Sequence, residues 1–289
     1  MGEAVVADFV GRFHTADMKR TEPVTGRVLL SRKRLVLAHD GGKTTIPLSS
    51  VSDINVGTVP AKLSEFFSDT ITLAYSIDDG RNVAVIESGG DNVGRFKTVL
   101  FKTLLGGHKV KVKHPAKVGG RVTDASTKTA KLKLSKGSLR IVTRDGSVTI
   151  DLSTVTNFRR GQYDIAGKKR PTIEVTHMHN GTAKTTFISL PNNRKLNLLG
   201  RYLQLEYKDV MEEIAEIEIS PEQTEVLVSL YSAGGQAKLG EIVTGDVATV
   251  QLVLETLRKN ALISENGSAL SLTAKGRVVV TEQIEDVNM

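Results

Sequence analysis

Cationic side chains gather at two places in this sequence, and their types and spacing best fit a chemical role. Five cations and one acid fall within twelve positions around GQYDIAG, in a segment that we expect to be a loop between a strand and the next hairpin. Such a density of like charge is costly to leave unpaired, which favours an anion or acidic-protein contact over a merely solvated loop. The candidate protein-binding residues are Arg159, Arg160, Lys168, Lys169, Arg170, Arg32, Lys33 and Arg34.

The other polar groupings in the sequence do not predict a catalytic, cofactor or metal site. His177 and His179 would share one face of a strand and could hold a metal, but no third ligand has a recognisable spacing, so solvated residues beside a turn are the better interpretation. Asp78, Asp79 and Asp91 are interpreted as turn and helix-cap residues. The sequence contains no Cys, phosphate loop, dinucleotide fingerprint or nucleophile elbow. We therefore expect a protein that is not an enzyme and needs no cofactor or small-molecule substrate.

Charge is divided unevenly along the 289 residues, whose net charge is +7. Residues 1–208 hold 34 Lys and Arg against 18 Asp and Glu, a net of +16, whereas residues 209–289 hold 5 against 14, a net of −9. The basic part suits rapid encounter with nucleic acid, anionic lipid or acidic protein, and charge alone does not choose among them. The sequence has neither an apolar run of about 20 residues nor a signal-peptide pattern, and with zero Cys it fits the cytoplasm.

One stretch of the chain repeats another without a gap, 104 positions apart. Residues 31–57 read SRKRLVLAHDGGKTTIPLSSVSDINVG, and residues 135–161 read SKGSLRIVTRDGSVTIDLSTVTNFRRG. The identical positions are mostly apolar and turn residues, such as Leu35 and Leu139 or Gly42 and Gly146, whereas the differences are mainly polar. This pattern predicts two copies of one small β-rich domain with different surfaces, which is more typical of a binding protein than of an enzyme.

Each copy is predicted to contain short antiparallel strands followed by one helix. In the first copy, alternating apolar residues and Gly-rich turns predict strands, and the apolar spacing changes to a helical period over residues 91–105. In the second copy the corresponding helix spans residues 192–207, and the segment 109–117, KVKVKHPAK, is expected to be an extended, solvated strand or connector. The expected fold class is α+β, with two tandem pleckstrin-homology-like (GRAM-like) β-barrels, each closed by a helix, over residues 1–107 and 108–208.

The last part of the chain, residues 209–289, is predicted to form a winged helix-turn-helix. Ser220 and Pro221 begin a helix, residues 238–242 and 246–260 continue the helical pattern, and a hairpin around residues 262–273 precedes a final helix over 275–284. A net charge of −9 argues against DNA binding, because neutralising phosphates supplies most non-specific affinity. A protein-contact or dimerising module is therefore preferred.

Several segments of the first copy resemble the CheF family of archaeal taxis proteins. They include AVVADFVGRF at 4–13, VTGRVLLS at 24–31, VGTVPAKLSEFFSDTITLAY at 56–75 and VAVIESGGDNVGRFKTVLFKTLL at 83–105. The resemblance is dense there and looser in the second copy and the tail. It implies an adaptor that connects phosphorylated CheY to the switch proteins at the base of the archaellum. The sequence pI of about 9.5 departs from the acidic haloarchaeal members and suggests a non-halophilic archaeal source.

Two other functions stay open at this point, and so does a homodimer. The basic copies would also suit an anionic membrane surface, and the winged helix would also suit a nucleic-acid-binding regulator. For the adaptor, a basic platform fits receiver and switch proteins that are expected to be acidic. No nucleic acid is expected as a partner.

Overall fold

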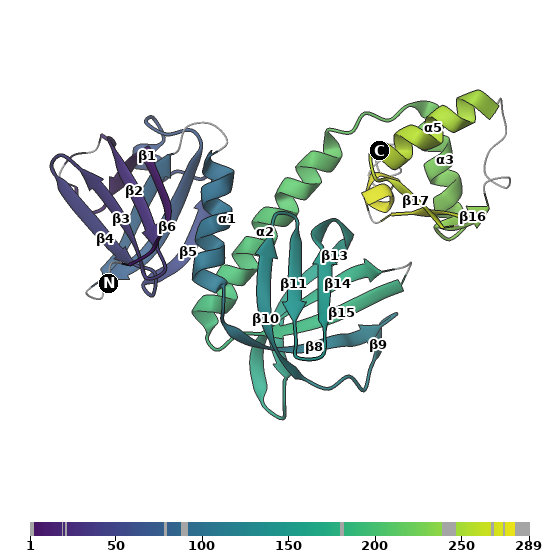
Figure 1. Ribbon diagram of the computed structural model, residues 1–289, viewed down its shortest axis with the longest axis horizontal. Coiled ribbons are helices and arrows are strands. Elements are labelled where there is room, and N and C mark those ends of the chain that lie inside the picture. The colour runs from purple at the N-terminus through teal and green to yellow at the C-terminus, as the bar shows by residue number, and fades with distance from the viewer. Residues whose placement is uncertain are drawn as a thin grey trace.

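The computed structural model describes most of the chain, and its elements lie in three sheets with four labelled α-helices (Figure 1). The described residues are 3–18, 20, 22–77, 80–87, 92–179, 182–238, 247–266, 269–273 and 275–280. Asp78, Asp79 and Asp91, and most of the short helix expected at 238–242, lie outside them; Lys238 is the last residue of strand β16.

The first sheet has seven antiparallel strands in the order β4-β3-β2-β1-β7-β6-β5. Its hairpins follow the predicted turns, since His39 and Gly42 close the β3–β4 pair and Ile77 and Gly80 close the β6–β7 pair. The strands are β1 (Val5–Thr15), β2 (Val24–Ser31), β3 (Arg34–His39), β4 (Gly42–Pro47), β5 (Val51–Val56), β6 (Thr70–Ile77) and β7 (Gly80–Glu87), with a short 3₁₀ helix, η1, at Ala61–Leu63.

The second sheet repeats this strand order as β12-β11-β10-β8-β15-β14-β13, with β9 added beside β8. Ser31 ends β2 and Ser135 ends β10, so the sequence repeat falls on equivalent strands and two copies of one fold are present. The strands are β8 (Lys109–Val118), β9 (Arg121–Val122), β10 (Lys128–Ser135), β11 (Ser138–Val142), β12 (Ser147–Asp151), β13 (Val155–Asp164), β14 (Lys169–His179) and β15 (Thr182–Ser189), with a 3₁₀ helix, η2, at Leu152–Thr154. The segment KVKVKHPAK is thus a strand, β8, as one of the two predicted alternatives had it, but it is interior and not solvated along its edges, because β10 and β15 pair with them.

Neither sheet closes into the barrel that the sequence predicts, although the α+β class with mostly antiparallel sheets is confirmed. Within the described residues, β4 does not pair with β5 and β12 does not pair with β13, so both sheets keep open ends. Apolar side chains of the helices pack against the inner faces of the sheets and bury them without strand closure.

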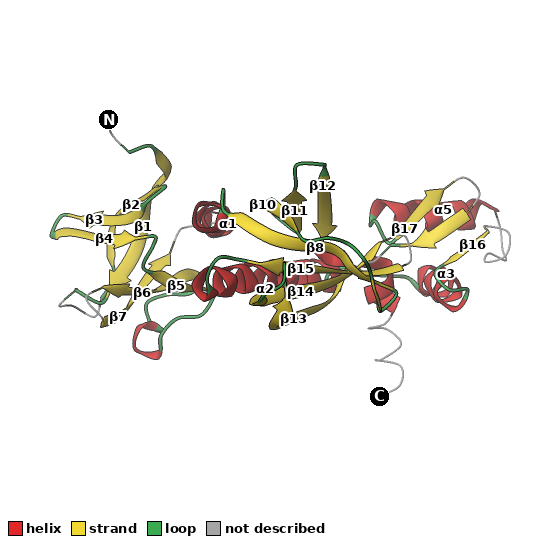
Figure 2. Ribbon diagram, turned by 90° about the horizontal axis from the view of Figure 1, so that it is seen from below, coloured by secondary structure: helices red, strands yellow, loops and turns green. Residues whose placement is uncertain are grey.

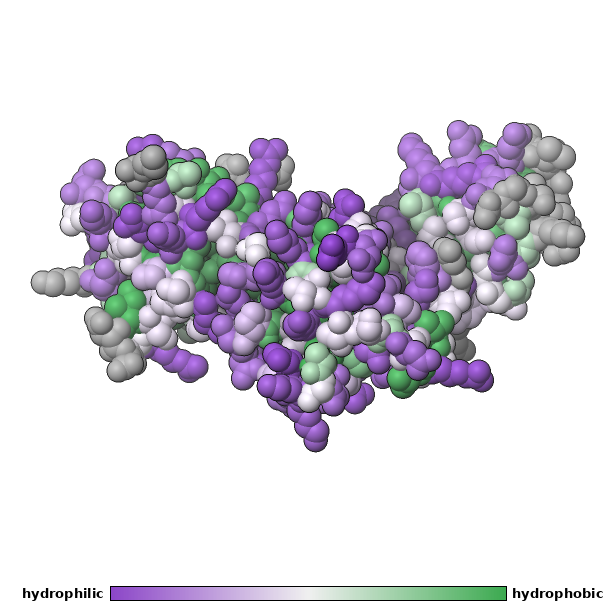
Figure 3. All heavy atoms as spheres, turned by 60° about the horizontal axis from the view of Figure 1, so that its bottom comes forward, coloured by the Kyte–Doolittle hydropathy of each residue, from purple (hydrophilic) through white to green (hydrophobic). Residues whose placement is uncertain are grey.

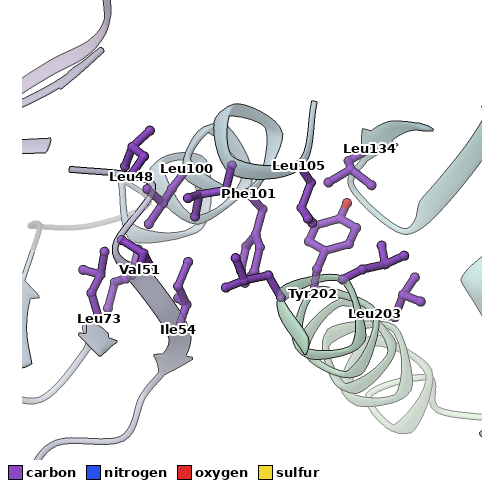
Figure 4. Close-up of a cluster of buried hydrophobic side chains, with 14 of the residues drawn as sticks. Leu48, Val51, Ile54, Leu73, Leu100, Phe101, Leu105, Leu134, Tyr202 and Leu203 are labelled. Carbon is purple, nitrogen blue, oxygen red and sulfur yellow. The ribbon is translucent and has the colours of Figure 1, made fainter. Parts of the chain in front are cut away.

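Helices α1 (Asn92–Leu105) and α2 (Asn193–Ala215) join the two copies through one continuous core. The Asn192 side chain accepts a hydrogen bond from the Lys195 amide and so begins α2, which runs eight residues beyond its predicted end at Tyr207. The rings of Phe101 and Tyr202 lie 5.3 Å apart where the helices meet. Figure 4 shows side chains from both copies at this junction, among them Leu48, Ile54, Phe101, Leu134 and Tyr202.

The C-terminal part packs around a separate core at the far end of α2, opposite the first sheet (Figures 1 and 2). Ser220 begins α3 with a capping box to Gln223, and Ile214 of α2 is buried in the same core as Leu230 and Leu257. Its elements are α3 (Pro221–Ser232), β16 (Gln236–Lys238), α5 (Val247–Lys259), β17 (Ile263–Asn266) and β18 (Ala269–Leu272), followed by helical residues 275–280. The three strands form a small sheet in the order β16-β18-β17.

Candidate protein-interaction surface

The larger cationic cluster lies on the β13–β14 hairpin and not on the loop that the sequence predicts. Tyr163 pairs with Arg170 and Asp164 with Lys169, so four of the five cations are strand residues and Lys168 lies in the turn. The Ile165 amide donates to the Lys168 carbonyl over 2.9 Å, and Ala166 and Gly167 have positive φ angles of 57° and 72°, which close a tight turn. The cations therefore stand on an edge hairpin of the second sheet, where charged residues are common.

The five cations of the hairpin lie in different surroundings. Lys168 and Lys169 are exposed at the turn, whereas Arg170 is half-buried. Arg159 lies directly across from Glu174 on one face of the pair. The next residue, Arg160, faces the opposite way and donates to the Asn197 side chain on α2. The sequence cluster is thus not one continuous patch, and Lys168 and Lys169 are its exposed residues at the tip of the hairpin.

Glu174 anchors a polar network on the outer face of the second sheet. Its carboxylate accepts a 2.8 Å hydrogen bond from Lys117 Nζ and a hydrogen bond from the Tyr163 hydroxyl. Burial acts to raise the pKa of Glu174, but these donors, with Arg159 nearby, more than offset it and hold the pKa below its usual value. The Tyr163 and Phe187 rings lie 4.4 Å apart with their planes tilted by 33°, so the polar and aromatic groups of this face contact one another within the chain.

A groove of about 260 Å³ lies between α2, strand β13 and the edge of β5, and we call it the α2 groove. Its apolar lining is Phe158, Ile173, Leu196 and Leu203. Arg159, Arg160 and Arg201 supply positive charge around it, and Arg201 also pairs with Asp53 of β5 at 3.2 and 3.1 Å. A concave site with an apolar lining and a cationic rim fits an amphipathic acidic partner.

The second cluster, Arg32 to Arg34, lies at the β2–β3 turn of the first sheet. The Ser31 hydroxyl accepts hydrogen bonds from the Lys33 and Arg34 amides over 3.3 and 3.1 Å and so holds the turn. All three cations are exposed, and Arg34 also pairs with Glu3 at 2.9 Å. The two clusters therefore belong to different sheets, and the first sheet offers three exposed cations here, one of them paired with Glu3.

The structure also brings together three charged residues that the sequence did not single out. Lys97 of α1 lies 3.1 Å from Glu206 and also pairs with Asp209, both on α2, and the Gly137 amide donates to Glu206 over 2.8 Å. Burial acts to lower the pKa of Lys97, but the two carboxylates raise it overall. Because Lys97 and Glu206 are far apart in sequence, no local spacing could have revealed the pair.

His177 is buried and not solvated as the sequence suggested, because its ring turns toward the core side of β14 beside Val175. It stacks on His114 with ring centres 6.0 Å apart, and only His179 of the predicted pair is exposed. Burial, then the neighbouring His114, lowers the pKa of His177 to about 4. In the described part of the chain, no three His, Cys, Asp or Glu residues are grouped so as to hold a metal.

The exposed surface is mostly hydrophilic in the view of Figure 3, with small apolar areas between polar ones. Among the described residues, no helix is both long and apolar enough to cross a membrane. These features leave the α2 groove and the hairpin lysines as the main candidate contact sites.

Comparison with known proteins identifies similar sequences over the whole chain. The family model described as "Archaeal Chemotaxis signal transduction system protein F" matches residues 5–209. Taxis protein CheF2 of Halobacterium salinarum is 43% identical over 289 residues, which cover 100% of both chains. Taxis protein CheF1 of the same organism is 28% identical and covers 98% of each chain. Among solved structures, the Inner Membrane Complex Sub-compartment Protein 3 of Toxoplasma gondii is 12% identical with a TM-score of 0.28, covering 43% of this chain and 90% of that one, too low a similarity to inform the fold.

Proposed function

Since this chain belongs to the archaeal CheF family of chemotaxis signal transduction proteins, we propose that it is a non-enzymatic adaptor of the taxis system. In this role it binds phosphorylated CheY and relays the signal to the switch proteins of the archaellum motor. It would act in the cytoplasm and be recruited to the base of the archaellum.

The observation that carries the proposal is the full-length match to a taxis protein. The charge of the chain supports it, because residues 1–208 carry a net of +16 and the exposed Lys168 and Lys169 project from an edge hairpin. Complementary charge speeds encounter and is screened by salt, which suits a signalling contact that must form and break quickly.

The proposal includes a domain architecture of three units. Residues 1–107 and 108–208 are taken as pleckstrin-homology-like domains, supported by their shared strand order and by the helix that follows each sheet. Residues 209–289 are taken as a winged helix, supported by α3, α5 and the three-stranded sheet. The boundary at 208 falls within α2, so the third unit begins on a helix that it shares with the second.

Co-purification tests the adaptor role directly. The tagged full-length chain should retain CheY from the same organism when CheY carries a phosphoryl mimic, and it should also retain the archaellum switch proteins. Liposomes of anionic lipid and duplex DNA at physiological salt serve as controls for the other two functions. Retention of neither protein partner, with binding to lipid or DNA instead, would replace the adaptor with a membrane or nucleic-acid module.

A further inference from the structure

The duplication places β5 and β13 in equivalent positions, at the open ends of their sheets. Val51 begins β5 and Val155 begins β13, and these residues are matched in the 104-position repeat. Both strands pair with one neighbour, β6 or β14, and leave their other edge without a strand in the described chain. The surroundings of the two free edges can therefore be compared.

Helix α2 covers the end of the first sheet at β5. Arg194 Nη1 donates to the Leu48 and Val51 carbonyls over 3.0 and 2.8 Å. Arg201, two turns further along α2, forms a two-pronged pair with Asp53. Since exposed strand edges otherwise recruit other chains, these contacts protect β5 with a cationic helix.

At β13, α2 makes side-chain contacts only: the Phe158 ring packs edge-on against Tyr207, and Arg160 donates to Asn197. Among the described residues, β13 pairs only with β14. Within that part of the chain, no helix side chain donates a hydrogen bond to the backbone of β13 in the way that Arg194 donates to the Val51 carbonyl of β5. In the repeat, Arg159 and Arg160 of β13 correspond to Asn55 and Val56 of β5. The charged residue at the β5 edge is the acidic Asp53, whereas the charged residues at the β13 edge are basic. A helix that covered β13 in the same manner would have to be acidic.

Gly200 gives an independent indication that the α2 groove is kept open. It lies in the α2 helix and lines the groove, although glycine within a helix is less stable than alanine there. A methyl group there would meet only Ile173 Cδ1, at an ordinary 3.6 Å, so packing does not require the glycine. Arginines on β13 could serve only to keep other strands from pairing with its free edge. That role would not require a glycine at position 200 of the facing helix, α2.

We infer that the α2 groove docks an acidic amphipathic helix from a partner protein, which lies against β13 as α2 lies against β5. The apolar face of that helix would contact Phe158, the part-exposed apolar residue of the groove lining, and its carboxylates would pair with Arg160 and compete with Asp53 for Arg201. This inference rests on the proposed adaptor role, since it names the kind of segment through which a taxis partner binds.

A synthetic helix tests the groove without any natural partner. The probe carries Leu on one face and Glu on the other, and its control carries Lys in place of Glu. By fluorescence anisotropy with the full-length chain, the Glu helix should bind at least about tenfold more tightly than the Lys helix. Gly200→Phe should abolish this binding by filling the groove, whereas Gly200→Ala should retain it. A Glu helix that fails to bind, or that binds Gly200→Phe as well as the unaltered chain, would overturn the inference.

A second arm uses the protein partner retained in the co-purification. Arg160→Glu should weaken its binding about tenfold, and the matched Lys131→Glu, an exposed reversal on β10, should change it less than about twofold. Hydrogen exchange of the unaltered complex should show new protection over 155–160 and 196–204. If the partner binds without that protection, the groove is not its site although the adaptor role stands; if the Glu helix binds but neither taxis protein is retained, the adaptor role fails and the groove stands.

Discussion

At the scale of single residues, Lys97 and Glu206 are the most deeply buried ion pair between the two copies. Their side chains are 6% and 1% exposed, and the pair joins α1 of one copy to α2 of the other. A buried charge that loses its partner keeps its full desolvation penalty, whereas an exposed pair loses little when it is broken. This contrast allows the contribution of the Lys97–Glu206 pair to the contact between α1 and α2 to be tested.

Lys97→Met should lower the free energy of unfolding by about 3–5 kcal/mol, because it leaves Glu206 buried without its cation. Urea denaturation of the full chain measures this. The matched control is Lys136→Met, whose pair with Glu213 has side chains 76% and 57% exposed, and it should cost less than about 1 kcal/mol. Equal losses of unfolding free energy for the two variants would show that the contact between α1 and α2 does not depend on the buried pair.

His177 should make the chain sensitive to acid. Its pKa of about 4 in the folded chain lies below the ordinary value of 6.5, so the unfolded chain takes up the proton at higher pH. The contribution of neutral His177 is complete above pH 6.5 and is lost as the pH falls toward 4. His114, His179 and Lys184, which face it, add to the repulsion of a charged ring.

Between pH 7 and pH 4.5 this loss should amount to about 2 kcal/mol, measured as the difference in unfolding free energy between the unaltered chain and His177→Asn. His179→Asn removes one of the lesser neighbours of the His177 ring and should leave most of the loss in place, because burial is the main cause. Parallel profiles for the unaltered chain and His177→Asn would mean that the ring is not buried in its neutral form.

At the scale of elements, the β13–β14 hairpin shows where prediction from the sequence succeeds and fails. The repeat, the turns at 40–42 and 145–146 and the helix periods are local patterns, and each marks an element of the structure. The run Arg159 to Arg170 reads as a loop because charge and Gly dominate it, yet Ile173 and Glu174 supply a partner strand. Edge strands tolerate charge, so composition alone cannot separate them from loops.

Lys168→Glu with Lys169→Glu should slow association with the phosphorylated receiver about tenfold at low salt and much less at high salt, because both side chains are exposed and act through long-range charge. Stopped-flow measurements give the rates, and thermal melting should show little change. Lys131→Glu with Lys133→Glu reverses two exposed charges on the same sheet and serves as the control. Equal rates for both double variants would remove the hairpin turn from the contact.

At the scale of the whole molecule, the two copies form one body and the acidic C-terminal part has its own core. The contacts that build this arrangement join residues far apart in sequence, such as Arg201 with Asp53 and Tyr202 with Phe101. No local sequence pattern predicts such contacts. The α2 groove exists only because α2, β13 and β5 meet, so the sequence could supply its cations but not their placement. The expectation of closed barrels failed for the same reason, since helices from the shared core cover the open sheets.

The measurement that tests the central claim most directly is calorimetry of the full-length chain with CheY in two states, at physiological salt. The adaptor account predicts that CheY carrying a phosphoryl mimic binds at least about tenfold more tightly than unmodified CheY, and that added salt weakens the binding. Equal affinity for the two states, or no heat of binding with either, would contradict it.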